Sequence, residues 1–532
     1  TNETVTLDAN VDPPVDTQCV DGTSQPCELT FKNVGIFIDG DDSDSSHESN
    51  IVTQIAGKPS GSEPNATTQR IRVLRTDENT GACVPGLKDT TNATFSYLVP
   101  EADEGLENNT INVSGKTSAE LEDNDTSKRI KLDFNNNGSA PFHFTSKDAG
   151  KYSLKVDMEI PVTNSSGEKT GEKIPASDMS NSFVARPLAV YVDAINADGD
   201  SNPQAQDASG EKFAIAGKDF ELQFKSLRWT SERDTPPSNG QWDACGDTNI
   251  TDVPNSDFAR VPNWNIGQPN TNIKMPNSGT NGTLNYNNGN VAFAKGKYQA
   301  NANATYDEVG IIQIQKNAIN DFLGKQVNVC SPYIGRFIPD RFRVTDNSPG
   351  FGDGCSEFTY MGQQFPLNSI EPRFIITAKN ANNQTTQNYD GDFWKLPDNL
   401  SNRTYKNNST IYANATNSSS LSLVRSKNGS TSLYGVNTNY NGTEWITLSG
   451  DWLTYQKPVN STEPFQAKVN LNLNATDLKD TDGVCYDPDQ DNDCDPYRIA
   501  SINGTELRYG RIKLFPAYGS ELLDLDMEFE TQ

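Results

Sequence analysis

The chain has 532 residues, enough for three or four domains at roughly 100–200 residues each. Its net charge of −27 argues against binding to nucleic acid or to anionic lipid, because both need clustered Lys and Arg. Only 34% of the residues are hydrophobic, but they gather in short runs such as 34–38 and 374–377. Runs of that length between polar stretches predict strands in a folded chain rather than disorder.

Apolar and polar residues alternate in several of these segments, including residues 70–74, 129–133 and 468–473. Such alternation is typical of half-buried strands in antiparallel sheets with one face in water. Helix patterns are weak throughout. The predicted fold class is therefore all-β, with tandem antiparallel β-sandwich domains and long loops.

One segment of the first third indicates a specific kind of sandwich. The sequence Asp148-Ala-Gly150-Lys-Tyr152 precedes an alternating strand and is similar to the tyrosine corner of immunoglobulin-type domains. In that corner the Tyr hydroxyl returns to upstream backbone. The alternative is an ordinary turn before a strand. We expect an immunoglobulin-like fold at least in the first domain.

Two similar segments, 183–192 and 335–344, place a basic residue and a proline before an alternating strand. Proline fixes φ and suits a stiff crossover into a new sheet. We therefore predict domains at 1–185, 186–340 and 341–532. Residues 229–303 are expected to form a long inserted loop region in the second domain, either functional or internally packed. Trp242 and Trp264 in this region are candidate ligand contacts, and core packing is the alternative role.

The eight cysteines contain no C-x-x-C pair, and an even count without metal spacing favours disulfides formed in an oxidising compartment. Two pairs lie close in sequence, and the other two pairings are guesses by elimination. The predicted bonds are Cys19–Cys27, Cys485–Cys494, Cys330–Cys355 and Cys83–Cys245.

An acidic loop near the C-terminus is the strongest candidate for chemistry. Aspartates alternate with other residues between Cys485 and Cys494, and calcium takes six to eight oxygen ligands that crowded carboxylates supply. No EF-hand register is present. The alternative is a solvated acidic hairpin. The candidate calcium ligands are Asp482, Asp487, Asp489, Asp491 and Asp493.

The sequence gives little support for catalysis or membrane insertion. No Gly-x-Ser-x-Gly elbow or phosphate loop is present, and no run approaches the roughly 18 apolar residues of a membrane span. The chain begins at Thr1 without Met, so we expect a processed or trimmed product. We expect a protein that is not an enzyme, and a polysaccharide-active enzyme remains a minor alternative.

Four segments of the last 200 residues resemble signature blocks of the MshQ family. The upstream segments around Gly81-Ala-Cys-Val84 and Phe183 fit the same pattern. The four blocks are Gly335-Arg-Phe-Ile-Pro-Asp-Arg-Phe, Glu357-Phe-Thr-Tyr-Met-Gly-Gln-Gln-Phe365, Asn388-Tyr-Asp-Gly-Asp-Phe-Trp-Lys-Leu396 and Leu507-Arg-Tyr-Gly-Arg-Ile-Lys-Leu514. The resemblance implies a surface location and an association with the mannose-sensitive haemagglutinin pilus, a type IV pilus.

The leading hypothesis is an extracellular structural or adhesive component of a bacterial surface appendage. The alternative is a secreted pilus assembly factor that does not stay in the fibre. The expected partners are pilus or other surface proteins and surface glycans, with a homo-oligomer or fibre as a further expectation. We expect no nucleic-acid partner and no direct membrane insertion.

Overall fold

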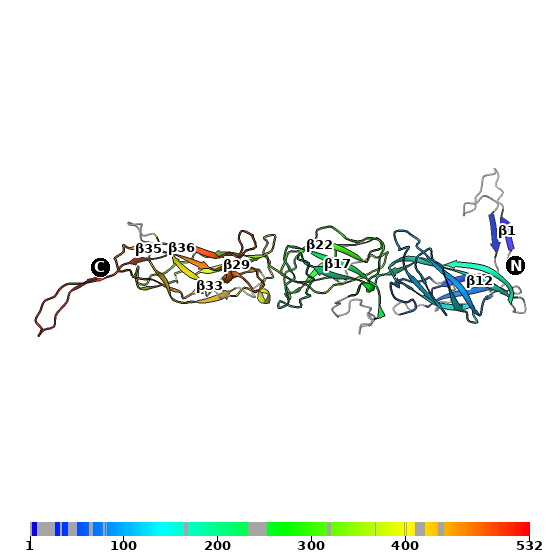
Figure 1. The fold of residues 1–532 in the computed structure, drawn as a ribbon, viewed down its shortest axis with the longest axis horizontal. Coiled ribbons are helices and arrows are strands. Elements are labelled where there is room, and N and C mark those ends of the chain that lie inside the picture. The colour runs from blue at the N-terminus through cyan, green and yellow to red at the C-terminus, as the bar shows by residue number, and fades with distance from the viewer. Residues whose placement is uncertain are drawn as a thin grey trace, which may run out of the picture.

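The computed structural model describes the following residues: 3–7, 27–31, 34–40, 50–62, 68–77, 80, 82–163, 169–231, 253–315, 321–367, 369–397, 400, 402–409, 421–434 and 441–531. The fold is all-β, as predicted. Three groups of strands lie end to end along the long axis of the molecule (Figure 1). We call them the N-terminal unit (β3–β14), the middle unit (β15–β25) and the C-terminal unit (β26–β36).

The N-terminal unit consists of two sheets around one core, in which Phe95, Phe142 and Phe144 are buried. The first sheet, in the order β10-β7-β12-β14-β4 with β13 beside β12, has the bounds Lys128–Asp133, Thr90–Leu98, Gly150–Thr163, Phe183–Arg186, Gln54–Ile55 and Lys169–Met179. The second, in the order β3-β5-β11-β8-β9 with β6 beside β5, has the bounds Val34–Asp39, Gln69–Thr76, Ser139–Ser146, Ile111–Ser114, Ser118–Leu121 and Cys83–Pro85.

The predicted tyrosine corner is confirmed at the start of β12. Tyr152 is fully buried, and its hydroxyl donates a hydrogen bond of 3.1 Å to the carbonyl of Ala149. Gly150 has φ +153°, and a Cβ there would lie 2.7 Å from the Tyr152 hydroxyl. The corner therefore needs glycine at this position.

The middle unit has its own core, which includes Phe224 and Phe337. Its larger sheet, in the order β20-β22-β17-β15-β24, has the bounds Leu284–Tyr286, Gln299–Tyr306, Asp219–Leu227, Ala189–Ile195 and Asn328–Cys330. The facing sheet, β16-β25-β23-β19, has the bounds Ala214–Ile215, Ile334–Ile338, Gly310–Ile314 and Thr271–Met275. A third pair joins β18 (Trp264–Gly267) to β21 (Val291–Phe293), and a 3-10 turn, η2, covers Asn255–Asp257.

A long inserted loop is expected at 229–303, but the structure has strands over residues 253–303. That stretch contains β18 to β21 and the start of β22, which pairs with β17 along its length. Its short apolar runs are too brief to show as strands in a sequence rich in Asn and Gly, but they gain partners from distant strands. The internally packed alternative is the correct one for these residues.

The C-terminal unit has the largest core, which includes Phe374, Tyr455 and Leu471. The sheet β26-β29-β33-β32 has the bounds Arg341–Asp346, Arg373–Lys379, Thr443–Ser449 and Ser430–Tyr434. The sheet β27-β36-β35-β30 has the bounds Thr359–Tyr360, Tyr497–Arg508, Phe465–Leu473 and Thr404–Asn407. The smaller sheet β28-β34-β31 has the bounds Gln364–Pro366, Trp452–Tyr455 and Leu423–Lys427, and the 3-10 turns η3 and η5 cover Gly391–Phe393 and Ala475–Leu478.

The same strand arrangement recurs at one end of all three units. A two-residue strand (β4, β16 or β27) pairs in parallel with the last strand of its own unit (β14, β25 or β36). A tight turn follows each of these short strands, with glycine at φ between 84° and 87°. In the first two units this turn has the same sequence, Ile-Ala-Gly-Lys, at 55–58 and 215–218. The chain is therefore an array of related units.

Two further hairpins stand apart from the units, one at each end of the molecule (Figure 1). β1 (Glu3–Leu7) pairs with β2 (Cys27–Phe31), and β37 (Ile512–Leu514) pairs with β38 (Phe529–Thr531). Within the described ranges no helix has the length and apolar character needed to span a membrane.

Candidate functional site

The N-terminal and middle units meet at an ion pair between Asp148 and Arg260. The Arg260 backbone N–H donates to Oδ1 of Asp148 at 2.8 Å, and its Nε and Nη2 donate to Oδ2 at 2.9 and 2.6 Å. The Asp148 side chain is 3% exposed. Charge-assisted bonds of this fork geometry are stronger than neutral ones and fix orientation. They hold the two units in one arrangement.

Backbone contacts surround this ion pair. The N–H of Ala149 donates to the carbonyl of Arg260 at 3.0 Å, and the N–H of Trp229 donates to the carbonyl of Ala56 at 2.8 Å. Gly57 follows in the Ile-Ala-Gly-Lys turn, and a Cβ there would lie 2.4 Å from the Trp229 carbonyl oxygen. Lys295 of the middle unit donates to the carbonyl of Ala102 at 2.7 Å. This joint is closely packed.

The middle and C-terminal units meet at Glu308, a buried carboxylate 5% exposed. Its Oε1 accepts the backbone N–H of Val309 at 2.8 Å and of Asn388 at 3.1 Å, and its Oε2 accepts that of Gln387 at 2.9 Å. Burial raises the pKa of Glu308 to about 7, although the backbone N–H groups, led by that of Asn388, oppose the shift. The second joint thus contains a carboxyl group that titrates near neutral pH.

Asparagine side chains complete the second joint. Asn388 is fully buried; its Nδ2 donates to the carbonyls of Thr280 and Val309 at 2.8 and 3.0 Å, and its Oδ1 accepts the Thr280 N–H at 2.8 Å. The N–H of Ala381 donates to the carbonyl of Ala216, in the second Ile-Ala-Gly-Lys turn, at 3.0 Å. A buried amide with all these bonds made leaves little freedom for the units to rotate.

The two joints share one design. Asp148 and Glu308 each stand two residues before a glycine with positive φ, Gly150 at 153° and Gly310 at 135°, in the turn that precedes a strand. Each acid accepts hydrogen bonds from the following unit. The resemblance of the two turns is visible in the sequence. The groups that donate hydrogen bonds to the two acids are not, because they lie 112 residues from Asp148 and 79–80 residues from Glu308.

A second ion pair places Asp482 at the second joint. Arg336 of the middle unit donates from Nη1 and Nη2 to the two oxygens of Asp482 at 2.5 and 2.6 Å, and Lys212 donates to the Asp482 carbonyl at 2.8 Å. Desolvation acts against ionisation, but the hydrogen bonds and charge of Arg336 hold the pKa of Asp482 below its usual range. The prediction that Asp482 is a calcium ligand does not fit this position, because both of its oxygens bind Arg336.

Three of the other predicted calcium ligands do come together. Asp487, Asp489 and Asp491 each place a carboxylate oxygen within 4.8 Å of the others; Asp487 is buried and the other two are exposed. Asp487 also accepts the N–H groups of Gln490 at 2.7 Å and Asn492 at 3.1 Å, which shape the loop. Loss of water contacts, and then the charges of Asp491 and Asp495, raise the pKa of Asp489. These oxygens are suited to a hard cation.

Asp493 lies outside this group of three. Its backbone N–H donates to Oδ1 of Asp491 at 2.9 Å, and its side chain is exposed. The loop therefore offers three of the five carboxylates that the sequence pattern suggested.

A buried pair of acids lies close to the second joint. Glu444 is fully buried, and its carboxyl group hydrogen-bonds with Asp390, which is 1% exposed. Burial, followed by the charge of Asp390 and this hydrogen bond, raises the pKa of Glu444 to about 8. The Glu444 carboxyl group therefore holds its proton at neutral pH.

One of the four predicted disulfides is confirmed, and two are wrong. Cys485 and Cys494 are bonded with an S–S distance of 2.07 Å. Cys83 and Cys355 are free thiols, so neither Cys83–Cys245 nor Cys330–Cys355 forms. Cys330 is nevertheless disulfide-bonded. Pairing by elimination fails when two cysteines stay reduced. Cys19, Cys245 and the side chain of Cys27 lie outside the described residues.

The two tryptophans proposed as ligand contacts have different outcomes. Trp264 is 5% exposed and packs on Phe293 and Phe322, with ring centroids 5.3 and 5.0 Å away, while its Nε1 donates to the carbonyl of Asp321. Its predicted role as a surface ligand contact is wrong, and the core-packing alternative holds. Trp242 lies outside the described residues.

Comparisons with solved structures give distant similarities only. Invasin, a bacterial integrin-binding protein, matches at 11% identity with a TM-score of 0.29, over 90% of this chain and 61% of that one. This chain thus spans about three fifths of the invasin chain. A protein from Corynebacterium diphtheriae, described as membrane anchored, matches at 9% identity with a TM-score of 0.16, over 91% and 93% of the two chains. No curated protein matches the chain.

Family models identify the units. The model for the first, Ig-like domain of DUF6701, a domain of unknown function, matches residues 16–175. The models for the second and third DUF6701 domains match residues 186–305 and 308–501. The matches follow one another along the array of strands described above. The chain therefore consists of the three consecutive domains of the DUF6701 family, the first of them Ig-like.

Proposed function

We propose that this protein is a rigid extracellular stalk, a structural and adhesive component of a bacterial surface appendage. The observation that carries the proposal is the pair of joints at Asp148–Arg260 and Glu308–Asn388, which fix three β-sandwich units end to end (Figure 1). Flexible tandem domains are the default, because interfaces between domains are usually small and polar. Here both joints contain buried charged groups with several bonds each. A stiff rod suits a protein that spans distance.

Two other features support a location outside the cytoplasm. The Cys485–Cys494 disulfide is of a kind that persists in oxidising compartments. The net charge of −27 keeps an exposed protein soluble and repels the phosphates of nucleic acids. The resemblance to the MshQ family supports a more specific role beside a mannose-sensitive haemagglutinin type IV pilus.

The test is to shear the surface fibres from the source cells, purify them and quantify this chain by mass spectrometry. Retention in the fibre fraction, in stoichiometric amounts or at fibre ends, is the expected result. Recovery only from the periplasm, with none in fibres or on the surface, would contradict the stalk and favour a secreted assembly factor.

A calcium-stabilised loop is a second proposed function, favoured by the convergence of Asp487, Asp489 and Asp491. The disulfide closes the loop beside the second joint, where the N–H of Phe342 donates to the carbonyl of Cys485 at 2.7 Å. An ion bound there would stiffen the end of the C-terminal unit that faces the middle unit.

A further inference from the structure

A cleft of about 350 Å³ lies at one side of the middle unit, where the two facing sheets end in edge strands. β19 is the last strand of one sheet, and β20 is the last strand of the other. Residues 268–271, four residues of 282–286 and Gln315 line this side cleft. Small-molecule sites have volumes of roughly 300–1,000 Å³, so the side cleft suits a small ligand rather than a folded partner.

Hydrogen bonds between the two edges fix the shape of the side cleft. The Tyr286 hydroxyl, on the β20 side, donates to the carbonyl of Pro269 at 2.7 Å. The N–H of Ile273 in β19 donates to Oδ1 of Asn281, just before β20, at 3.0 Å. A ligand therefore meets walls that are already tied together, and binding loses little entropy in ordering them.

The inner surface of the side cleft is apolar. Pro269 is buried, and the side chains of Leu284 and Tyr286 are half-buried and pack against the core of the middle unit. Both side chains point to the inside of the sandwich, because they alternate along β20 with the exposed Asn285. The C–H groups on one face of a sugar ring pack well on such a surface, since they need no hydrogen bond.

The rim of the side cleft carries polar side chains that are available to a ligand. Gln268, Asn270 and Thr283 are exposed, and their side chains make no hydrogen bond with any residue that the structure describes. Amide and hydroxyl groups present hydrogen-bond donors and acceptors side by side. The hydroxyl groups of a sugar are also both donors and acceptors, so they match this rim.

None of the described residues that line the side cleft is charged, although 22% of the residues of the chain are. Asp307 lies directly beside the rim, because its Oδ1 accepts the backbone N–H of Thr283 at 2.7 Å. An anionic ligand would therefore find one carboxylate close by and no cation in the lining. This arrangement favours an uncharged saccharide over an acidic one.

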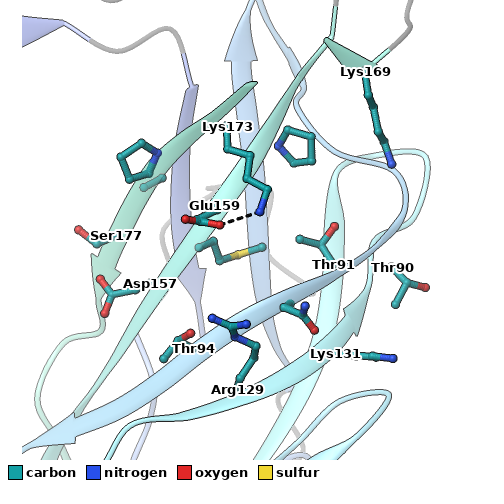
Figure 2. A pocket seen from close by; sticks show the side chains of 15 residues that line it. Thr90, Thr91, Thr94, Arg129, Lys131, Asp157, Glu159, Lys169, Lys173 and Ser177 are labelled. Carbon is teal, nitrogen blue, oxygen red and sulfur yellow. Dashed lines mark hydrogen bonds and ion pairs between the residues drawn. The ribbon is translucent and has the colours of Figure 1, made fainter. Parts of the chain in front are cut away.

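A groove in the N-terminal unit has the opposite character (Figure 2). Its volume is about 790 Å³, and residues of β7, β10, β12 and β13 line it. Six of these side chains are charged, and among them Lys173 donates to Glu159 at 2.8 Å. No aromatic side chain is among the described residues of its lining. The combination of an aromatic ring with uncharged amides thus distinguishes the side cleft from this groove.

We propose that the side cleft binds a short, uncharged saccharide. The sugar ring lies against Tyr286 and Leu284, and its hydroxyl groups bond to Gln268, Asn270 and Thr283. These five side chains take no part in the contacts described for the two joints, so binding leaves the rod intact. The inference rests on the adhesive part of the proposed function and names the chemical class of its ligand.

The test measures binding of neutral sugars to the purified full chain by saturation-transfer-difference NMR. The panel consists of glucose, galactose, mannose, N-acetylglucosamine and disaccharides of these. At least one of them should bind at millimolar concentration, with an affinity that is the same at low and high salt, because no ion pair forms. Glucuronic acid and N-acetylneuraminic acid should bind more weakly, since each carries a carboxylate.

Gln268→Ala with Asn270→Ala should weaken the binding by about tenfold or more, because the ligand loses at least two hydrogen bonds. Asn285→Ala with Asn303→Ala is the matched control. These two amides are exposed on the outer face of β20 and β22, away from the side cleft, and their removal should leave the affinity unchanged. Circular dichroism should show that both variants are folded.

The absence of binding by every neutral sugar of the panel would overturn the proposal. The retention of the chain in sheared fibres, which tests the stalk, would not be affected by that result. Equal affinity in the unchanged protein and in Gln268→Ala with Asn270→Ala would also overturn it, as would binding that is confined to acidic sugars. If short peptides bind in the same assay and sugars do not, the side cleft is a peptide site and the proposal is wrong.

Discussion

Arg260 closes a fork around the carboxylate of Asp148, with its Nη2 2.6 Å from Oδ2 and its backbone N–H 2.8 Å from Oδ1. The two residues belong to different units and are 112 positions apart. The same Arg260 Nη2 also donates to the carbonyl of Asn108 at 2.7 Å. One side chain therefore makes three hydrogen bonds across the first joint, and its removal is the simplest way to loosen the rod.

Arg260→Met should destabilise the contact between the N-terminal and middle units by about 3 kcal/mol. It leaves the buried Asp148 carboxylate with only one donor, the backbone N–H of residue 260. Differential scanning calorimetry should show the N-terminal and middle units melting in separate transitions. Lys116→Met is the control, because it removes an ion pair with Asp133 in which both side chains are about half exposed. A shared, unshifted transition in Arg260→Met would show that the ion pair does not couple the units.

Gly57→Ala should destabilise the protein more than Gly171→Ala does. Both glycines have similar positive φ, +84° and +89°, so both substitutions carry a backbone cost of about 1 kcal/mol. Only at Gly57 does the new Cβ meet a neighbour, the Trp229 carbonyl oxygen at 2.4 Å, whereas Gly171 has no atom within 4 Å. The difference between the two melting temperatures thus measures the tightness of the first joint. Equal losses would mean that the turn can move away from Trp229.

Stability should fall as pH rises through neutrality because of Glu308. Its pKa is raised from 4.5 in the unfolded chain to about 7 in the folded one, so the folded state binds the extra proton between these values. The stabilisation is therefore fully present below about pH 4.5 and is lost as pH rises through 7, on the order of 3 kcal/mol. Urea unfolding between pH 5 and 8 measures this slope.

Glu308→Gln should remove the part of that slope that Glu308 contributes, because the amide does not titrate. Glu444→Gln should reduce the slope that remains. The pKa of Glu444 is raised to about 8, so this group also stabilises the folded state less as pH rises. Asp482, whose pKa is lowered, contributes only at more acidic pH. An unchanged slope in Glu308→Gln would contradict the buried, titrating carboxyl group.

Calcium should raise the melting temperature of the C-terminal unit, and a chelator should lower it. At a calcium concentration about 100 times Kd, binding adds about 2.7 kcal/mol to stability. Asp489→Asn with Asp491→Asn should abolish the dependence, whereas Glu101→Gln with Asp103→Asn, exposed acids of another loop, should not. If the chelator has no effect on the unchanged protein, the loop is a solvated acidic hairpin.

The sequence was sufficient for the features that depend on local pattern. Alternation predicted the strands, Asp148-Ala-Gly150-Lys-Tyr152 predicted the buried corner, and the short spacing of Cys485 and Cys494 predicted their bond. Each of these depends on residues within about ten positions of one another. Residues so near to one another in sequence have few possible arrangements, so the local pattern is enough to predict their contact.

The features that depend on distant partners could not be predicted in the same way. Asp482 looks like a member of an acidic loop until Arg336, 146 positions away, binds it. Gly335-Arg336 and Asn388 belong to the segments that carry the family resemblance, yet nothing local shows that their side chains join units. The repeated Ile-Ala-Gly-Lys turn and the resemblance of the Asp148 and Glu308 turns are the signals of the joints that the sequence displays.

The central claim is that three units form one stiff rod, and small-angle X-ray scattering tests it most directly. The unchanged protein should scatter as a single extended particle whose maximum dimension is constant from low to high salt. Arg260→Met combined with Asn388→Ala should shorten and broaden the distance distribution, because both joints then bend. If the unchanged protein already shows that broad distribution, its units are flexibly linked and the rigid stalk is wrong.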